Sequence, residues 1–138
     1  MKSIKWQIGF TMIELLVTIS IIGIIAGLIT PSYQKYLKKA RYVEVIQATL
    51  PLKLAVEECY QLTGNLSECQ LGKNGILSSS SSPGIIDNIN ITGGIITITP
   101  KERYGIRAKD TYVLTPLIVN EYLTWGKSGG AVENGLAN

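Results

Sequence analysis

The strongest pattern in the chain is an almost uninterrupted apolar run over residues 9–29, GFTMIELLVTISIIGIIAGLI. An element that crosses a bilayer needs about 20 apolar residues, and 10–29 provides them. A single acid, Glu14, stands inside this run. A carboxylate in a membrane costs about 2.5–3.5 kcal/mol on insertion scales, so we expect Glu14 to have a function and a partner.

After the run, apolar residues recur at steps of three and four. The members of this stripe are Tyr33, Leu37, Ala40, Val43, Ile46, Leu50 and Leu54. Such spacing predicts an amphipathic helix that packs on another element through the stripe. The two patterns together predict a stalk helix over 10–62, about 75 Å long at 1.5 Å per residue, whose first half, 10–30, lies in lipid or against other helices.

Small residues and prolines modify this predicted helix. Pro31 and Pro51 lack an amide donor and clash with the preceding turn, so each should kink or locally break it. Gly23 and Gly27 form a G-x-x-x-G pair, which lets two helix backbones approach closely. Ordinary tolerance of glycine in membrane helices explains the same pair.

Turn and strand signals follow Gly64. Residues 63–84 are a connecting loop that contains the run Ser78–Ser82. Four strands are predicted at 85–92, 95–99, 111–117 and 121–125. A Gly-Gly pair makes the first two a tight hairpin, 118–120 joins the last two, and the tail 126–138 is loop. The expected fold is α+β, a long N-terminal helix packed on a four-stranded antiparallel sheet.

Composition excludes several classes of function. The formal net charge is +3 and includes two lysines in the first nine residues, which is too weak to favour nucleic acid as the principal partner. The chain has no histidine, no phosphate-binding glycine loop and no carboxylate cluster with ligand spacing. We therefore expect no enzyme activity, no catalytic residue, no cofactor and no metal.

The only cysteines, Cys59 and Cys69, stand ten residues apart and are too few for a four-thiolate zinc site. In an exported domain they predict one disulfide, and in a cytosolic protein two free thiols. The charges beside the apolar run do not favour export of the C-terminal part. Two lysines precede the run and four basic residues follow it closely, a bias that by itself predicts the opposite orientation.

The residues before the run decide among these alternatives. A short basic leader, MKSIKWQIG, covers 1–9, ends in Gly9 and is followed by Phe10. An ordinary secretory leader has an apolar stretch of about 7–15 residues and an A-x-A-like site after it, which this chain lacks. A plain membrane anchor leaves Glu14 and the glycine–phenylalanine junction unexplained. The segment resembles the class III signal of type IV pilins: glycine, then an aromatic residue, then a glutamate four residues on.

This resemblance assigns roles to individual residues. It implies that a prepilin peptidase cuts between Gly9 and Phe10 and that the new amine of Phe10 is methylated. It implies that Glu14 serves assembly by pairing with the amine of Phe10 on a neighbouring subunit. Pairing with the amine of Phe10 in the same helix is the alternative, and the sequence does not separate the two. Family members also carry a helix-breaking proline at the place of Pro31, and several a second one near Pro51. The implied architecture is the pilin fold, with a head over 63–138.

Two further motifs are similar to type IVa pilins, and one feature differs. Cys-Tyr-Gln at 59–61 and Leu-Thr-Trp at 123–125 match segments found in many members. Such members usually carry two more cysteines that close a C-terminal loop, where this chain has alanines within 128–131 and 135–137. A receptor-binding role of that loop therefore does not carry over with the resemblance.

The implied function is that of a structural subunit of a type IV pilus. The protein would wait in the bacterial inner membrane and then assemble with copies of itself into an extracellular filament, with the pilus assembly machinery as a partner. The filament would serve adhesion, twitching motility and DNA uptake, with a host receptor or DNA as ligands. The alternatives are a pseudopilin of type II secretion and a membrane-anchored periplasmic binding module. The run Ser78–Ser82 is either a plain flexible loop or a carrier of O-linked sugar.

Overall fold

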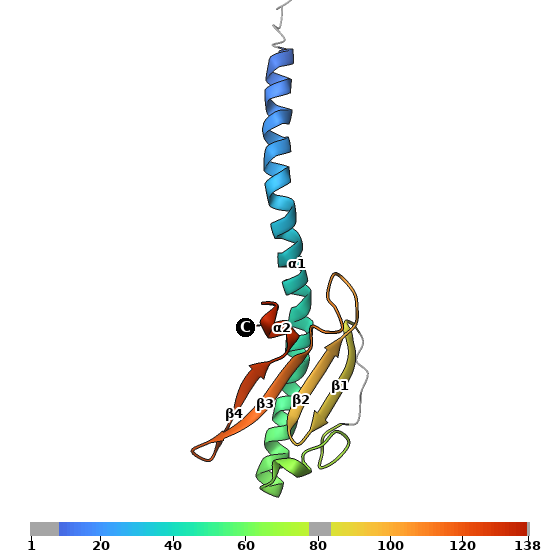
Figure 1. The fold of residues 1–138 in the computed structure, drawn as a ribbon, viewed down its shortest axis with the longest axis vertical. Helices are drawn as coiled ribbons and strands as arrows, with labels where there is room; N and C mark the ends of the chain where they lie inside the picture. Colours follow the sequence, from blue (N-terminus) through green and yellow to red (C-terminus); the bar gives the residue numbers. More distant parts are fainter. Residues whose placement is uncertain (1–8, 78–83, 138) are drawn as a thin grey trace, which may run out of the picture. The chain divides into compact units, whose positions relative to one another are not determined.

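The computed structural model describes residues 9–77 and 84–137, so the leader residues 1–8 and the serine run 78–82 lie outside the described residues. The chain divides into two compact units, Met1–Tyr36 and Leu37–Asn138. Its elements are α1 (Met12–Thr63), η1 (Leu66–Glu68), β1 (Ile86–Thr92), β2 (Ile95–Pro100), β3 (Tyr112–Val119), β4 (Tyr122–Ser128) and α2 (Gly130–Glu133) (Figure 1). The second unit groups the later part of α1 with the whole sheet.

Helix α1 is 52 residues long and ends at Thr63, directly before a glycine. Gly64 takes a φ of 67°, a left-handed conformation that glycine adopts without strain, and its N–H donates to the Tyr60 carbonyl at 2.8 Å. Pro31 and Pro51 both lie inside α1, so neither proline ends the helix. A bend at either position stays a prediction.

The sheet has the order β1-β2-β3-β4 with antiparallel pairing throughout, which confirms the predicted α+β architecture. Gly93 and Gly94 form the predicted hairpin turn, with φ of 58° and 76°. The second hairpin turn differs from the prediction. Strand β3 continues through Val119, and the turn falls on Asn120 and Glu121, both with positive φ, because β-branched residues before them favour the strand.

The C-terminal tail is also more ordered than predicted. Strand β4 continues to Ser128 and the short helix α2 follows, where the sequence predicted only a loop. Ala131 and Ala137 are buried against the core of the second unit. Burial of these two alanines therefore packs the segment against the head.

The predicted apolar stripe of α1 is not the face that packs on the sheet. The fully buried residues of α1 are Tyr42, Val45, Thr49, Val56 and Cys59. Leu37, Val43, Leu50 and Leu54 are exposed instead. The buried face contains polar atoms that form hydrogen bonds inside the protein, so burying these atoms costs little free energy. Of the exposed residues, Val43, Leu50 and Leu54 lie on one side of the helix and leave a second apolar face on α1.

Cys59 and Cys69 form a disulfide, as predicted for an exported domain, and both residues are fully buried. The bridge joins the last turns of α1 to the segment that follows η1. From there the Cys69 carbonyl accepts the N–H of Gly94 at 3.0 Å, and the Leu71 N–H donates to Ile91 at 3.1 Å. The connecting segment is thus tied to both α1 and the β1–β2 hairpin.

Candidate functional site

The glycine–phenylalanine junction lies just before α1 begins. Gly9 and Phe10 are both exposed, and α1 starts at Met12. A Cβ added to Gly9 would meet no heavy atom within 4 Å, and its φ is not in the left-handed range. The described part of the chain therefore has no packing or backbone reason for a glycine at this position.

The Glu14 side chain forms hydrogen bonds at the N-terminal end of its own helix, α1. The Thr11 backbone N–H and hydroxyl both donate to Oε2 of Glu14, at 3.3 and 3.2 Å, and the Glu14 N–H donates back to the Thr11 hydroxyl at 3.3 Å. This reciprocal pattern is a capping box, in which a threonine before the first turn and a glutamate three residues on satisfy each other's donors. Sequence reasoning missed Thr11, although the T-x-x-E spacing is a recognised helix-start signal.

The helical segment Met12–Ile29 is long and apolar enough to cross a membrane, with a mean hydropathy of 2.5, and none of it is buried within the chain. The hydroxyls of Thr18 and Ser20 donate to helix carbonyls at 2.7–2.9 Å, so they do not need water. Nothing lies within 4 Å of a Cβ placed on Gly23 or Gly27, so no described residue packs on the small face that they form.

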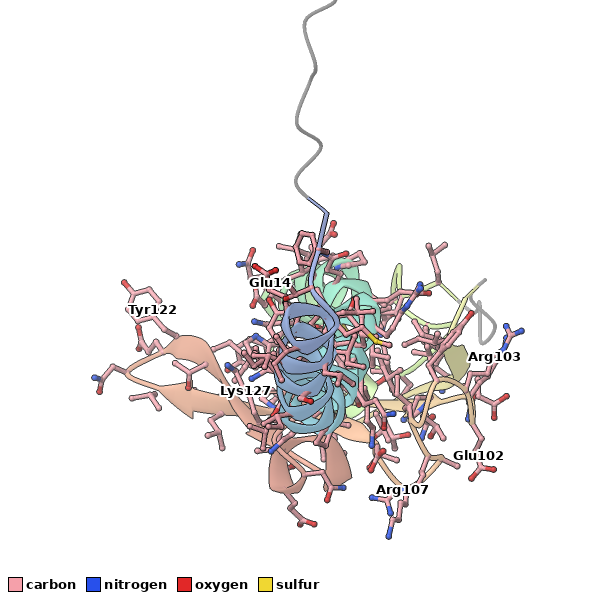
Figure 2. All side chains as sticks on the ribbon, turned by 90° about the horizontal axis from the view of Figure 1, so that it is seen from above. Glu14, Glu102, Arg103, Arg107, Tyr122 and Lys127 are labelled. Atoms are coloured by element: carbon pink, nitrogen blue, oxygen red, sulfur yellow. A yellow bond between two sulfur atoms is a disulfide. The ribbon has the colours of Figure 1, made fainter. Side chains whose placement is uncertain are left out.

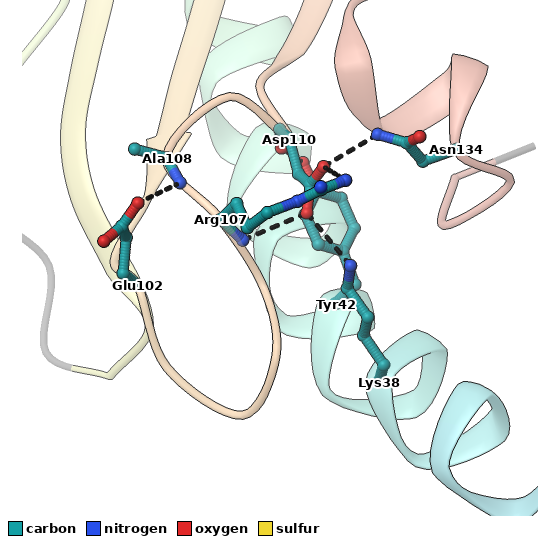
Figure 3. Close-up of polar contacts among 7 residues, drawn as sticks. All are labelled: Lys38, Tyr42, Glu102, Arg107, Ala108, Asp110 and Asn134. Atoms are coloured by element: carbon teal, nitrogen blue, oxygen red, sulfur yellow. Dashed lines mark hydrogen bonds and ion pairs between the residues drawn. The ribbon is translucent and has the colours of Figure 1, made fainter. Parts of the chain in front are cut away.

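A second polar site, which sequence reasoning missed, surrounds Asp110 in the head (Figure 3). The Asp110 carboxylate is fully buried and accepts from Lys38 Nζ at 3.1 Å, from the Arg107 amide at 3.0 Å and from Asn134 Nδ2 at 2.8 Å. Its backbone carbonyl accepts the Tyr42 hydroxyl at 2.6 Å. Asp110 closes a local turn by donating its N–H to the Arg107 carbonyl at 2.9 Å, and its side chain also joins α1, the β2–β3 loop and the C-terminal segment.

The charges around Asp110 change its titration. Burial by itself would raise the pKa of the Asp110 carboxyl, but hydrogen bonds from Arg107 and Lys38, together with their charges, hold it below its usual range. Burial and the nearby Asp110 charge raise the pKa of Tyr42 well above its ordinary value. Burial likewise raises the pKa of Tyr112. The ionised carboxylate with neutral tyrosines is the state that this packing favours.

Neither site has the composition of a catalytic or metal centre. Within 9–77 and 84–137, no group of three or more His, Cys, Asp or Glu side chains could hold a metal ion. The Asp110 cluster pairs one carboxylate with donors from three elements, which is the arrangement of a structural clamp. The N-terminal site combines an exposed apolar helix with one capped carboxylate, an arrangement suited to association.

Comparison with known proteins connects the N-terminal site to a family. Residues 7–30 match the family described as the prokaryotic N-terminal methylation motif. The chain is similar to the prepilin peptidase-dependent protein D of Escherichia coli K12, with 38% identity over 70% of this chain and 65% of that protein. It is similar to a type IV major fimbrial protein FimA of Dichelobacter nodosus, with 32% identity over 93% of this chain and 85% of that protein. The chain belongs to the type IV pilin family.

A solved structure supports the same conclusion at the level of the fold. The major type IV pilin PpdD of enterohemorrhagic Escherichia coli superposes with a TM-score of 0.56 and 26% identity, over 68% of this chain and 70% of that one. The pilin family consists of structural proteins that are not enzymes. The alignment with the E. coli protein D spans 65% of its length, just under two thirds of that relative.

Proposed function

We propose that this type IV pilin is the structural subunit of a type IV pilus and is made as a precursor. A prepilin peptidase cuts between Gly9 and Phe10, and the new amine of Phe10 is methylated. The observation that carries this proposal is the segment Met12–Ile29, an unburied apolar helix with one carboxylate, Glu14, directly after a glycine that the fold does not require. The family match over residues 7–30 supports the same processing.

Two apolar surfaces of α1 are left uncovered by the described residues of the chain. Before assembly the inner membrane covers Met12–Ile29, because lipid is the environment that such a helix prefers. In the filament, the same segment packs against helices of identical subunits. The second apolar face, with Leu50 and Leu54 at its centre, then packs on neighbouring subunits instead of remaining in water. The head, with its buried disulfide, lies outside the cytoplasm.

Glu14 sets the register between subunits in this proposal. Cleavage at Gly9 frees the amine of Phe10, which then stands next to Thr11, the residue that caps Glu14 in the uncut chain. The amine of a neighbouring subunit is a cation that can pair with the Glu14 carboxylate within the apolar bundle. Desolvation offsets much of the attraction, so the pair selects one register more than it adds stability.

The filament serves adhesion, twitching motility and DNA uptake in our proposal. These are the roles that the resemblance to type IV pilins implies for a polymer displayed on the cell surface. Deleting the gene and measuring attachment, colony spreading and transformation tests each role separately. If deletion abolishes protein secretion and leaves surface filaments unchanged, the pseudopilin alternative replaces the pilus.

The direct experiment is mass analysis of the N-terminus of protein from sheared surface filaments. We expect a mature chain that begins with methylated Phe10. Gly9→Val should leave full-length precursor in the membrane and remove the filaments, because the side chain clashes in a peptidase site shaped for glycine. Ser3→Val, a bulky change elsewhere in the leader, is the matched control and should be processed normally. Filaments built from chains with Met1 intact would overturn the proposal.

A further inference from the structure

The two ends of the sheet carry surfaces of opposite chemistry. The β2–β3 loop, residues 101–109, lies at one end of β3, and the β3–β4 turn at Asn120 and Glu121 lies at the other. Strand β3 has eight residues, so the two are separated by about 26 Å. Figure 2 shows Tyr122 on one side of the molecule, with Arg103 and Arg107 on the opposite side.

The β3–β4 turn borders a groove with the last turns of α1. The groove has a volume of about 420 Å³, and its walls include Glu57, Tyr60, Glu121 and Tyr122. Trp125 Nε1 donates to Glu57 Oε1 at 2.8 Å, which holds that carboxylate in the wall. Glu121 makes no hydrogen bond or ion pair with any described residue, and Tyr122 is 77% exposed.

Carboxylates beside exposed aromatic rings recognise a particular kind of ligand. The carboxylates attract a cation and accept its hydrogen bonds, and the ring faces attract the same cation through their quadrupole. A guanidinium satisfies both better than an ammonium does, because it is planar and less strongly hydrated. The groove therefore fits an arginine side chain from outside this molecule.

The 101–109 loop presents such side chains. It contains Lys101, Arg103, Arg107 and Lys109 against the single acid Glu102. Arg107 is committed to the Asp110 cluster, and Lys101 lies 3.5 Å from the Gly84 carbonyl. Arg103 and Lys109 are exposed and form no ion pair within the described chain.

A buried side chain and internal hydrogen bonds fix the conformation of the 101–109 loop. Ile106 is buried in the core, its N–H donates to the Arg103 carbonyl at 2.9 Å, and Glu102 accepts the Ala108 N–H at 3.5 Å (Figure 3). Tyr104 has a φ of 54° and an exposed ring, with the Arg103 guanidinium 5.8 Å from the ring centre. A loop ordered in advance loses little conformational entropy when it binds.

We propose that the groove of one subunit binds the 101–109 loop of a second copy of this chain, with Arg103 between Glu57 and Glu121. This inference rests on the proposed function, which supplies the second copy. Charge complementarity selects this occupant, because the cationic loop and the acidic groove belong to the same sequence. Since the two surfaces lie at opposite ends of the head, the contact is head-to-tail, and a contact that does not close on itself generates an open helical polymer.

Cysteine cross-linking between two full-length copies tests the contact. One copy carries Arg103→Cys and one tag, and the other carries Glu121→Cys and a second tag. Both are produced in one cell and oxidised in membranes and in sheared filaments. We expect a disulfide dimer that carries both tags. Within one chain the bond cannot form, because bridged Cα atoms lie within about 7 Å of each other.

The matched control replaces Glu121→Cys by Lys73→Cys, an exposed position outside the groove, and should give no mixed dimer. Charge exchange provides the second measurement. Arg103→Glu and Glu121→Arg should each lower the filament yield by at least about tenfold, because each places like charges opposite each other. The double variant should restore the yield in part, because Glu57 still faces the glutamate introduced at 103. Cross-linking and rescue should both weaken as the salt concentration rises.

The outcomes separate this contact from the proposed function. Wild-type filaments with neither cross-link nor charge rescue would overturn the contact, leave the pilus subunit in place and assign the groove to another occupant. A cross-link in membranes without any filaments would retain the contact and overturn the pilus proposal. Mixed dimers of equal yield from the Lys73→Cys control would show random collision and also overturn the contact.

Discussion

Lys38 and Asp110 are 72 residues apart in the chain, and the ammonium nitrogen of one lies 3.1 Å from a carboxylate oxygen of the other. The pair connects α1 to the β2–β3 loop, and Asn134 extends the connection to the C-terminal segment. The resemblance implies a second disulfide in this segment of related pilins, and this chain has no cysteine there. The Asp110 cluster, together with burial of Ala131 and Ala137, holds the segment in its place.

Removing this carboxylate should destabilise the head. Asp110→Ala leaves Lys38 without its partner and removes the acceptor of the Arg107 amide, so the free energy of unfolding should fall by about 3 kcal/mol. Thermal unfolding of the full chain in detergent, followed by circular dichroism, measures the change. Asp87→Ala, an exposed carboxylate on β1, is the control and should unfold like the wild type. Equal stability of the two variants would contradict a structural role for the cluster.

The same cluster predicts how stability depends on pH. Because the folded-state pKa of Asp110 lies below the usual value of about 3.9, the contribution is complete above that value and is lost as the pH falls through the folded-state pKa. The urea midpoints of wild type and Asp110→Asn should therefore differ by a constant amount above about pH 5 and converge in stronger acid. A difference that grows on acidification would contradict the lowered pKa.

The disulfide should carry a large share of the stability of the head. Cys59 and Cys69 close a short loop, and opening it should lower the free energy of unfolding by about 3 kcal/mol in the chain-entropy account. We expect Cys59→Ser to be processed but to give fewer filaments that proteases cut more readily. Limited proteolysis of sheared filaments measures this. Alkylation of unreduced wild-type protein should label no thiol, and two labels per chain would rule the bridge out.

Glu14 should be required for assembly and not for processing. Glu14→Ala should yield mature protein in the membrane without surface filaments, which N-terminal mass analysis and shearing measure together. Thr11→Val is the matched variant, because it removes the hydroxyl of the cap and keeps the carboxylate. It should still form filaments. An equal loss in both variants would assign the effect to the helix cap. Normal piliation of Glu14→Ala would exclude the proposed pairing of Glu14 with the Phe10 amine.

The exposed face of α1 should matter between subunits and not within one. Leu54→Glu should change the free energy of unfolding by less than about 0.5 kcal/mol, as surface substitutions usually do, but should remove filaments. Val56→Glu, two residues along the same helix, places an unpaired carboxylate in the core and should prevent folding. Filaments from Leu54→Glu in normal amount would show that this face stays in water.

The sequence by itself determined those features that depend on neighbouring residues. The apolar run predicts the unburied segment of α1, the Gly93–Gly94 pair predicts the first hairpin turn, and ten-residue spacing in an exported domain predicts the Cys59–Cys69 bridge. The Gly9–Phe10 junction and Glu14 come from the same local patterns, and their roles in processing and assembly stay predictions. Thr11 was open to prediction too, because a capping box is a local pattern.

Only the tertiary structure decided which face of α1 is inside. Hydrophobicity alone favours the stripe with Leu50 and Leu54, yet the sheet covers the face with Tyr42 and Thr49, whose polar atoms bond to Asp110 and to α1 itself. Sequence reasoning could not predict the Asp110 cluster either, since the donors Lys38 and Asn134 lie far from Asp110 in the chain. Such choices depend on which groups a folded sheet brings within hydrogen-bond distance, and spacing along a sequence does not encode that distance.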